Sequence, residues 1–163
     1  MAWTIITPLH NAQPIATVDT VQNHPLGMRV LASDPTYNVG EFIYMKGVTS
    51  LIATDWVTIA EDFTAVRLVA DAKGPVAVAM SAADAATKFG WFQIYGKAIG
   101  GSGAAITDGA AIYAHGTAGL VDDAVVDGDM VHNAFARSTI AGAAITGEFD
   151  IFYPYCDDIA AND

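Results

Sequence analysis

The segment Phe89-Gly-Trp-Phe-Gln-Ile-Tyr-Gly96 decides the fold class, because it is the strongest strand signal in the chain. It is rich in aromatic residues, and a glycine closes it, as is typical of a β-strand. Trp91 and Tyr95 alternate along it with large apolar residues on the other side, so both faces carry bulk. We therefore expect this strand to be covered by a core on one face and by a neighbouring subunit on the other.

Working outward from this segment, short apolar runs recur with turn residues between them about every 8–12 positions, the spacing of a sandwich or barrel. The clearest runs cover residues 40–47, 55–59, 66–69, 76–80 and 148–153. The sequence therefore predicts an all-β chain, a compact β-sandwich or β-barrel-like domain. The stretch Ser81–Thr87 has helical propensity but spans only about two turns, so at most one short helix is expected.

The first 38 residues differ from the rest because they hold four of the six prolines. Proline lacks a backbone donor and restricts the residue before it, which disfavours regular structure. We expect an extended N-terminal arm over residues 1–38, a β domain over 39–156 and an acidic C-terminal tail over 157–163. The alternative for the arm is one or two strands paired with the main sheet, with Met28–Leu31 as the best segment.

The chain is strongly acidic, with 7 Lys and Arg against 18 Asp and Glu and a formal net charge of −11. Nucleic-acid surfaces need a field of basic residues, so we expect no nucleic-acid partner. No apolar run approaches the roughly 18 residues that span a bilayer, so no membrane partner is expected. The first basic residue is Arg29, which argues against a secretory signal and favours synthesis in a cytoplasm.

Motifs that carry catalytic or metal chemistry are weak in this sequence. The single cysteine, Cys156, is expected to be a small buried hydrophobe, and no two histidines have helical metal-binding spacing. The acidic run Asp122–Asp129 is too short for an EF-hand and is expected to be a solvated hairpin loop. The run Gly100–Gly103 lacks the lysine of a phosphate loop and is expected to connect strands. We therefore expect no enzyme, no cofactor and no metal.

Three segments in order, residues 89–98, 106–113 and 117–124, resemble small head decoration (cement) proteins of tailed bacteriophages. Those proteins have an aromatic strand ending in Gln-Ile/Val-x-Gly, then a strand of the form Gly-Ala-x-Ile/Leu-Tyr, then an Ala-Gly-x-Val-Asp turn. The stretches Gly40–Tyr44 and Gly74–Val78 are similar to the same group. The resemblance covers roughly residues 38–155, and it leaves the arm before residue 38 unaccounted for.

The resemblance implies a virion structural protein that performs no catalysis. Such a protein binds the major capsid protein on the outside of the phage head, commonly as a trimer at threefold and local threefold positions, and stabilises the shell. The acidity of the chain and its lack of paired cysteines are compatible with this assignment. The proline-spaced arm would then be a strap that becomes ordered on contact.

The interface residues we expect are the apolar anchors of the arm and the outer residues of the aromatic strand: Trp3, Ile5, Ile6, Leu9, Trp91 and Tyr95. The main alternative is a carbohydrate- or receptor-binding β-domain of a phage tail or surface lectin, with Trp56 or Trp91 as a sugar platform. A small enzyme with dispersed carboxylates, or another virion component such as a tail tube protein, is a further alternative. The mass of the oligomer separates a decoration trimer from a larger ring.

Overall fold

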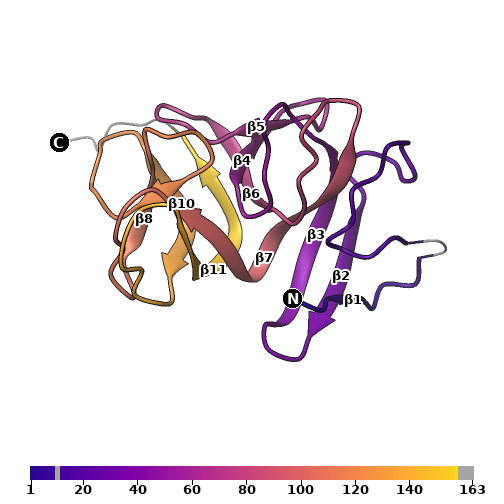
Figure 1. The fold of residues 1–163 in the computed structure, drawn as a ribbon, viewed down its shortest axis with the longest axis horizontal. Helices are drawn as coiled ribbons and strands as arrows, with labels where there is room; N and C mark the ends of the chain where they lie inside the picture. Colours follow the sequence, from indigo (N-terminus) through magenta and orange to yellow (C-terminus); the bar gives the residue numbers. More distant parts are fainter. Residues whose placement is uncertain (10–11, 158–163) are drawn as a thin grey trace.

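The computed structural model describes residues 1–9 and 12–157, and every regular element in that part of the chain is a β-strand. The predicted all-β class is therefore confirmed (Figure 1). The strands are β1 (Thr4–Ile5), β2 (Arg29–Asp34), β3 (Asn38–Lys46), β4 (Trp56–Ile59), β5 (Ala65–Arg67), β6 (Gly74–Ala79), β7 (Phe89–Ser102), β8 (Ala111–Ala114), β9 (Val121–Asp122), β10 (Met130–Ala136) and β11 (Ile145–Cys156).

These strands form one mixed sheet in the order β1-β2-β3-β7-β9-β8-β10-β11-β6-β4-β5. The pairing of β7 with β9 is parallel, and the other pairings are antiparallel. Strand β7 also pairs with β11 and β6, so part of the sheet closes into a ring. In Figure 1, β7 runs from the side of β2 and β3 to the side of β8, β10 and β11, which makes it the strand that joins the two halves.

At Trp91 and Phe92, both faces of β7 are covered by this same chain. Trp91 is fully buried on one face, where its ring meets the Tyr44 ring edge-on at 5.1 Å in the cluster that also holds Trp3. Phe92 points to the other face and packs in a second cluster with Met45. The neighbouring subunit expected from the two-sided bulk is therefore not needed to bury this part of the strand, because the folded chain supplies both layers.

A bulge in β7 between Gln93 and Tyr95 shifts the register with β3, and from Tyr95 onward the other edge of β7 pairs with β11. Gly96 has φ +97°, and a Cβ there would lie 2.6 Å from the carbonyl oxygen of Val39, so the position requires glycine. The fully buried Gln93 donates its side-chain amide to the carbonyl oxygens of Tyr95 and Lys97, at 3.1 and 3.0 Å. Both acceptors lie just beyond the bulge, so the buried amide helps to fix the backbone there.

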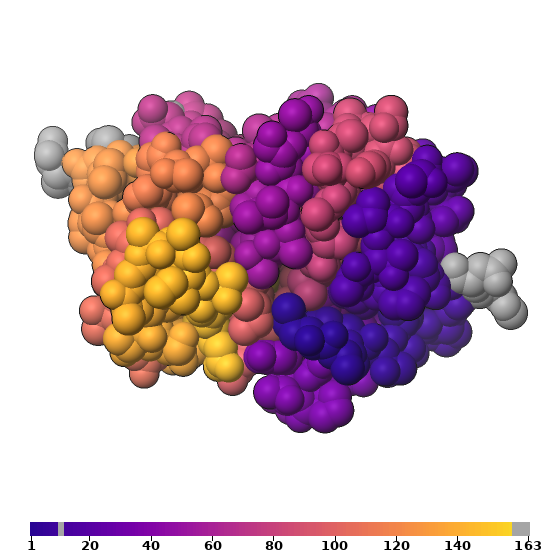
Figure 2. Space-filling model, viewed as in Figure 1, coloured from indigo at the N-terminus to yellow at the C-terminus, as the bar shows by residue number. Residues whose placement is uncertain are grey.

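Much of the expected N-terminal arm is part of the domain. Strand β2 pairs with β3 over six residues, and β1 pairs with β2, as in the alternative that placed a strand near Met28–Leu31. The Ala2 amide donates to the Asp34 carboxylate at 2.6 Å, while Trp3 and Ile15 are buried in the core. In the space-filling view the described N-terminal residues lie against the body of the molecule (Figure 2). The segment without long strands therefore ends at residue 28 rather than 38.

The structure has no helix at Ser81–Thr87 and describes only the first residue of the predicted acidic tail. Ser81–Thr87 forms bends and a turn rather than a helix, and the carbonyl oxygen of Ala83 accepts a bond from the Val48 amide at 3.1 Å. This contact holds the segment against the β3–β4 connection, and tertiary packing outweighs its helical propensity. Of the expected acidic tail, Asp157 lies 3.3 Å from the His132 ring, and residues 158–163 lie outside the described residues.

Candidate functional site

Exposed aromatic side chains are concentrated on one group of strands. All the aromatic residues that are exposed within residues 1–9 and 12–157 come from β7, β10 and β11: Tyr95, Phe135, Phe152, Tyr153 and Tyr155. Phe152 stands opposite Tyr95 in the β7–β11 register, and Phe135 stands opposite Asp150 in the β10–β11 register. We call Tyr95, Phe135, Phe152 and Tyr153 the aromatic face. Its residues are 37–49% exposed, and clustered exposed apolar surface of this kind marks interaction sites.

A second bulge, in β11, builds the centre of the aromatic face. Tyr153 has φ +52°, an unusual backbone conformation for a residue other than glycine. With this geometry the consecutive residues Phe152 and Tyr153 both contact the Tyr95 ring, with ring centroids 5.6 and 5.5 Å away. The Tyr153 hydroxyl donates to Glu41 at 2.6 Å, and this bond raises the pKa of Tyr153. The three rings are therefore held in place before any partner binds.

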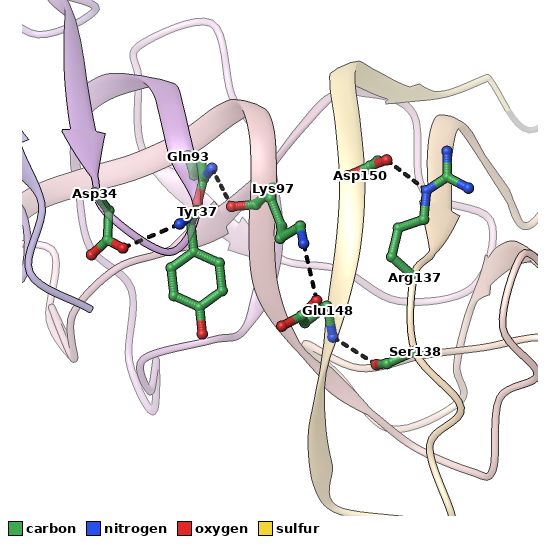
Figure 3. Close-up of polar contacts among 8 residues, drawn as sticks. All are labelled: Asp34, Tyr37, Gln93, Lys97, Arg137, Ser138, Glu148 and Asp150. Atoms are coloured by element: carbon green, nitrogen blue, oxygen red, sulfur yellow. Dashed lines mark hydrogen bonds and ion pairs between the residues drawn. The ribbon is translucent and has the colours of Figure 1, made fainter.

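The charged residues around the aromatic face are paired with each other. Lys97 lies 3.2 Å from Glu148, and Arg137 donates to Asp150 at 2.5 Å (Figure 3). The Glu148 amide is also held by the Ser138 hydroxyl at 3.1 Å. Each pair joins one cation to one anion, so this region is close to neutral although the whole chain carries −11. Aromatic residues and arginine with few unpaired charges are the composition of protein–protein interfaces.

An apolar groove of about 430 Å³ borders the aromatic face beyond Tyr153. Its floor includes the buried side chains of Ile43, Val76 and Ile94, from three different strands. Arg29 lies at its edge with its side chain 58% exposed. The groove combines an apolar floor with a single cationic side chain, which suits an apolar group that has a carboxylate beside it.

The expected interface residues are scattered rather than gathered. Trp3 is 8% exposed and Trp91 is fully buried, so both serve the core of this chain and offer almost no surface to a partner. Ile5 and Leu9 are half-buried beside the same cluster, and Ile6 is exposed on the N-terminal segment. Tyr95 is the one expected residue that lies on the aromatic face.

The interface residues predicted from the sequence do not include Phe135, Phe152 and Tyr153. One signal was present: Phe152-Tyr153-Pro154-Tyr155 places two aromatic residues in succession, which breaks the alternation of the preceding strand residues. Such a break just before proline is compatible with a bulge, and a bulge can turn consecutive side chains to the same side. Which strands lie next to this bulge depends on the sheet order, which is not local information.

Residues considered for catalytic or metal chemistry have structural roles. Cys156 is buried as predicted, and burial, followed by the charges of Asp157 and Asp129, raises its pKa to about 12. In the acidic run, the Asp123 carboxylate accepts the Thr107 amide at 2.9 Å and that of Asp129 accepts the Asp71 amide at 2.6 Å. Among the described residues, no group of three or more His, Cys, Asp or Glu side chains could hold a metal ion.

The run Gly100–Gly103 lies mainly within β7 rather than in a connector. A Cβ at Gly100 would lie 2.5 Å from the indole nitrogen of Trp56, so the missing side chain makes room for that buried ring. Trp56 and Trp91 are both fully buried, so neither is placed to form the sugar platform considered in the alternative function.

Comparisons with protein-family models, with curated proteins and with solved structures found no match for this chain. Within residues 1–9 and 12–157 there is also no helix long and apolar enough to cross a membrane.

Proposed function

We propose that this protein is a virion structural protein that binds the outside of a tailed-phage head and stabilises the shell. The observation that carries the proposal is the aromatic face, where exposed rings are preorganised among charges that are already paired. Binding such a surface removes apolar area from water and requires little rearrangement of charge. The resemblance to head decoration proteins supports the major capsid protein as the partner.

Stabilisation would follow from linkage. A protein that binds the assembled shell and not its dissociated subunits shifts the equilibrium toward the shell by mass action. If the protein is a trimer, as the resemblance implies, three footprints act together and bind far more tightly than one. The acidic remainder of the chain would keep the bound protein away from packaged nucleic acid.

The test is cosedimentation of the purified protein with expanded heads of the phage that encodes it. We expect saturable binding by the wild type, and an affinity reduced about tenfold or more by Tyr95→Ser or Phe152→Ser. Val66→Ser on the edge strand β5 is the matched control, because it removes a 47% exposed apolar side chain elsewhere. Failure of the wild type to bind, or equal binding by all four proteins, would overturn the proposal.

Carbohydrate or receptor binding is the second candidate, and one observation favours it. Tyr95 and Tyr153 expose their rings, and the Glu41 carboxylate is bonded to the Tyr153 hydroxyl. Exposed rings beside a fixed carboxylate can stack on a sugar and accept bonds from its hydroxyl groups. A glycan-array signal that Tyr95→Ala abolishes, together with absence of head binding, would replace the first candidate by this one.

A further inference from the structure

The loop between β9 and β10 presents an unusually exposed apolar tip. Val125 is 76% exposed, the highest value for a large hydrophobic residue in the described part of the chain, and Val126 is 47% exposed. Asp123 and Asp127 flank the pair in the sequence. We call residues 123–127 the acidic loop. Exposure on this scale has no role in the packing of the chain itself.

The acidic loop is held at its base, so its tip is preorganised. The Asp122 carboxylate accepts the Ala124 amide at 3.1 Å, and the Asp123 carboxylate accepts the Thr107 amide at 2.9 Å. At the far end the Asp129 amide donates to the Val126 carbonyl at 3.2 Å. A loop fixed in this way loses little conformational freedom when its tip is buried by a partner.

The groove beside Tyr153 has the complementary chemistry. Its floor is apolar, and Arg29 at its edge is engaged only weakly. Within the described residues the close partner of Arg29 is Glu41 at 3.6 Å, beyond normal hydrogen-bond distance. Glu41 instead accepts the Tyr153 hydroxyl at 2.6 Å, so the guanidinium donors of Arg29 remain available for another carboxylate.

We propose that the acidic loop of a second copy of this chain occupies the groove, with its two valines against the apolar floor and Asp127 beside Arg29. Charge complementarity favours this occupant, because a contact that sets Arg29 against Asp127 offsets part of the repulsion between two chains of net charge −11. Loop and groove are different patches, so reciprocal exchange of the contact closes a dimer and head-to-tail repetition closes a ring of three or more copies. The inference rests on the self-association part of the proposed function and not on capsid binding.

The experiment is sedimentation velocity over a concentration series, at low and at high salt. We expect concentration-dependent association that Val125→Asp weakens about tenfold or more, equivalent to about 1.4 kcal/mol. Val21→Asp is the matched control, because Val21 is 69% exposed on the N-terminal segment and should tolerate the same change. Both substitutions are at exposed positions, so the variants should fold.

A charge swap tests the specific contact. Arg29→Glu and Asp127→Arg should each weaken association about tenfold, and the double variant should return to within about threefold of the wild type. A monomer at every concentration up to about 1 mM, equal association by Val125→Asp and wild type, or no recovery in the double variant would each overturn the inference. Phage-head binding is measured separately: a monomer that binds heads overturns only this inference, and an oligomer that ignores heads overturns only the proposed function.

Discussion

Replacement of Trp91 by alanine tests the claim that this chain alone buries both faces of β7 around Trp91. Trp91 is fully buried and meets the rings of Tyr44 and His24 at 5.1 and 5.6 Å. Truncation of a buried Trp to Ala typically costs about 3–5 kcal/mol, from lost transfer energy and the cavity that remains. For a chain of this size that loss lowers the Tm by about 6–20 °C.

The assay is urea unfolding of dilute protein, followed by fluorescence and circular dichroism, with the wild-type slope retained. Trp91→Phe is the companion variant, because Trp91→Ala loses a large fraction of a typical domain's stability. Trp91→Phe should cost only about 1–2 kcal/mol, since the indole N–H of Trp91 has no hydrogen-bond partner to lose among the described residues. Tyr95→Ala on the same strand should cost about 1 kcal/mol or less, because its ring is exposed.

Burial of Trp91 by its own chain would be refuted if Trp91→Ala lost less than about 1 kcal/mol as a dilute monomer. It would also be refuted if the loss appeared only at concentrations where the protein associates, because the ring would then be buried by a neighbouring copy. Equal losses for Trp91→Ala and Tyr95→Ala would contradict the assignment of one residue to the core and the other to the surface.

Three further predictions concern buried groups. Gly100→Ala should destabilise the fold by about 1–3 kcal/mol in urea unfolding, because its Cβ would overlap the buried Trp56 indole. Arg67→Ala should cost about 3 kcal/mol, because it leaves the fully buried Asp55 carboxylate without its 2.8 Å cation partner. Burial already raises the pKa of Asp55, so lowering the pH should protonate it and restore part of the loss. The pKa of Cys156 is raised to about 12 against about 8.5 when unfolded, so its contribution to stability is complete below about pH 8.5 and is lost as the pH rises toward 12.

Matched variants separate these effects from general destabilisation. Gly116→Ala places its Cβ in open space, so it should be neutral or slightly stabilising, and a loss equal to that of Gly100→Ala would contradict the steric argument. Cys156→Ala should reduce the alkaline loss of stability by at most about 1.4 kcal/mol per pH unit. An unchanged alkaline slope in that variant would show that other groups cause the loss.

The order of residues along the chain was enough to predict the all-β fold class and several local features. Alternating apolar residues separated by glycine turns require strands, because strand side chains point to opposite faces in turn. The buried state of Cys156 was predictable from its residue type alone, since free cysteine usually packs as a small hydrophobe. A strand near Met28–Leu31 was also visible as an alternative, although proline spacing favoured an arm.

Which large side chains are buried and which are exposed to solvent follows from the arrangement of the strands in three dimensions. Trp91 and Tyr95 belong to the same aromatic strand, yet one is fully buried and the other is 37% exposed. The difference arises at the bulge between Gln93 and Tyr95, because beyond it one edge of β7 pairs with β11, and there Phe152 and Tyr153 meet Tyr95 on the outer side. Local propensity carries no information about which distant strand becomes a neighbour, and that pairing is what assembles the aromatic face.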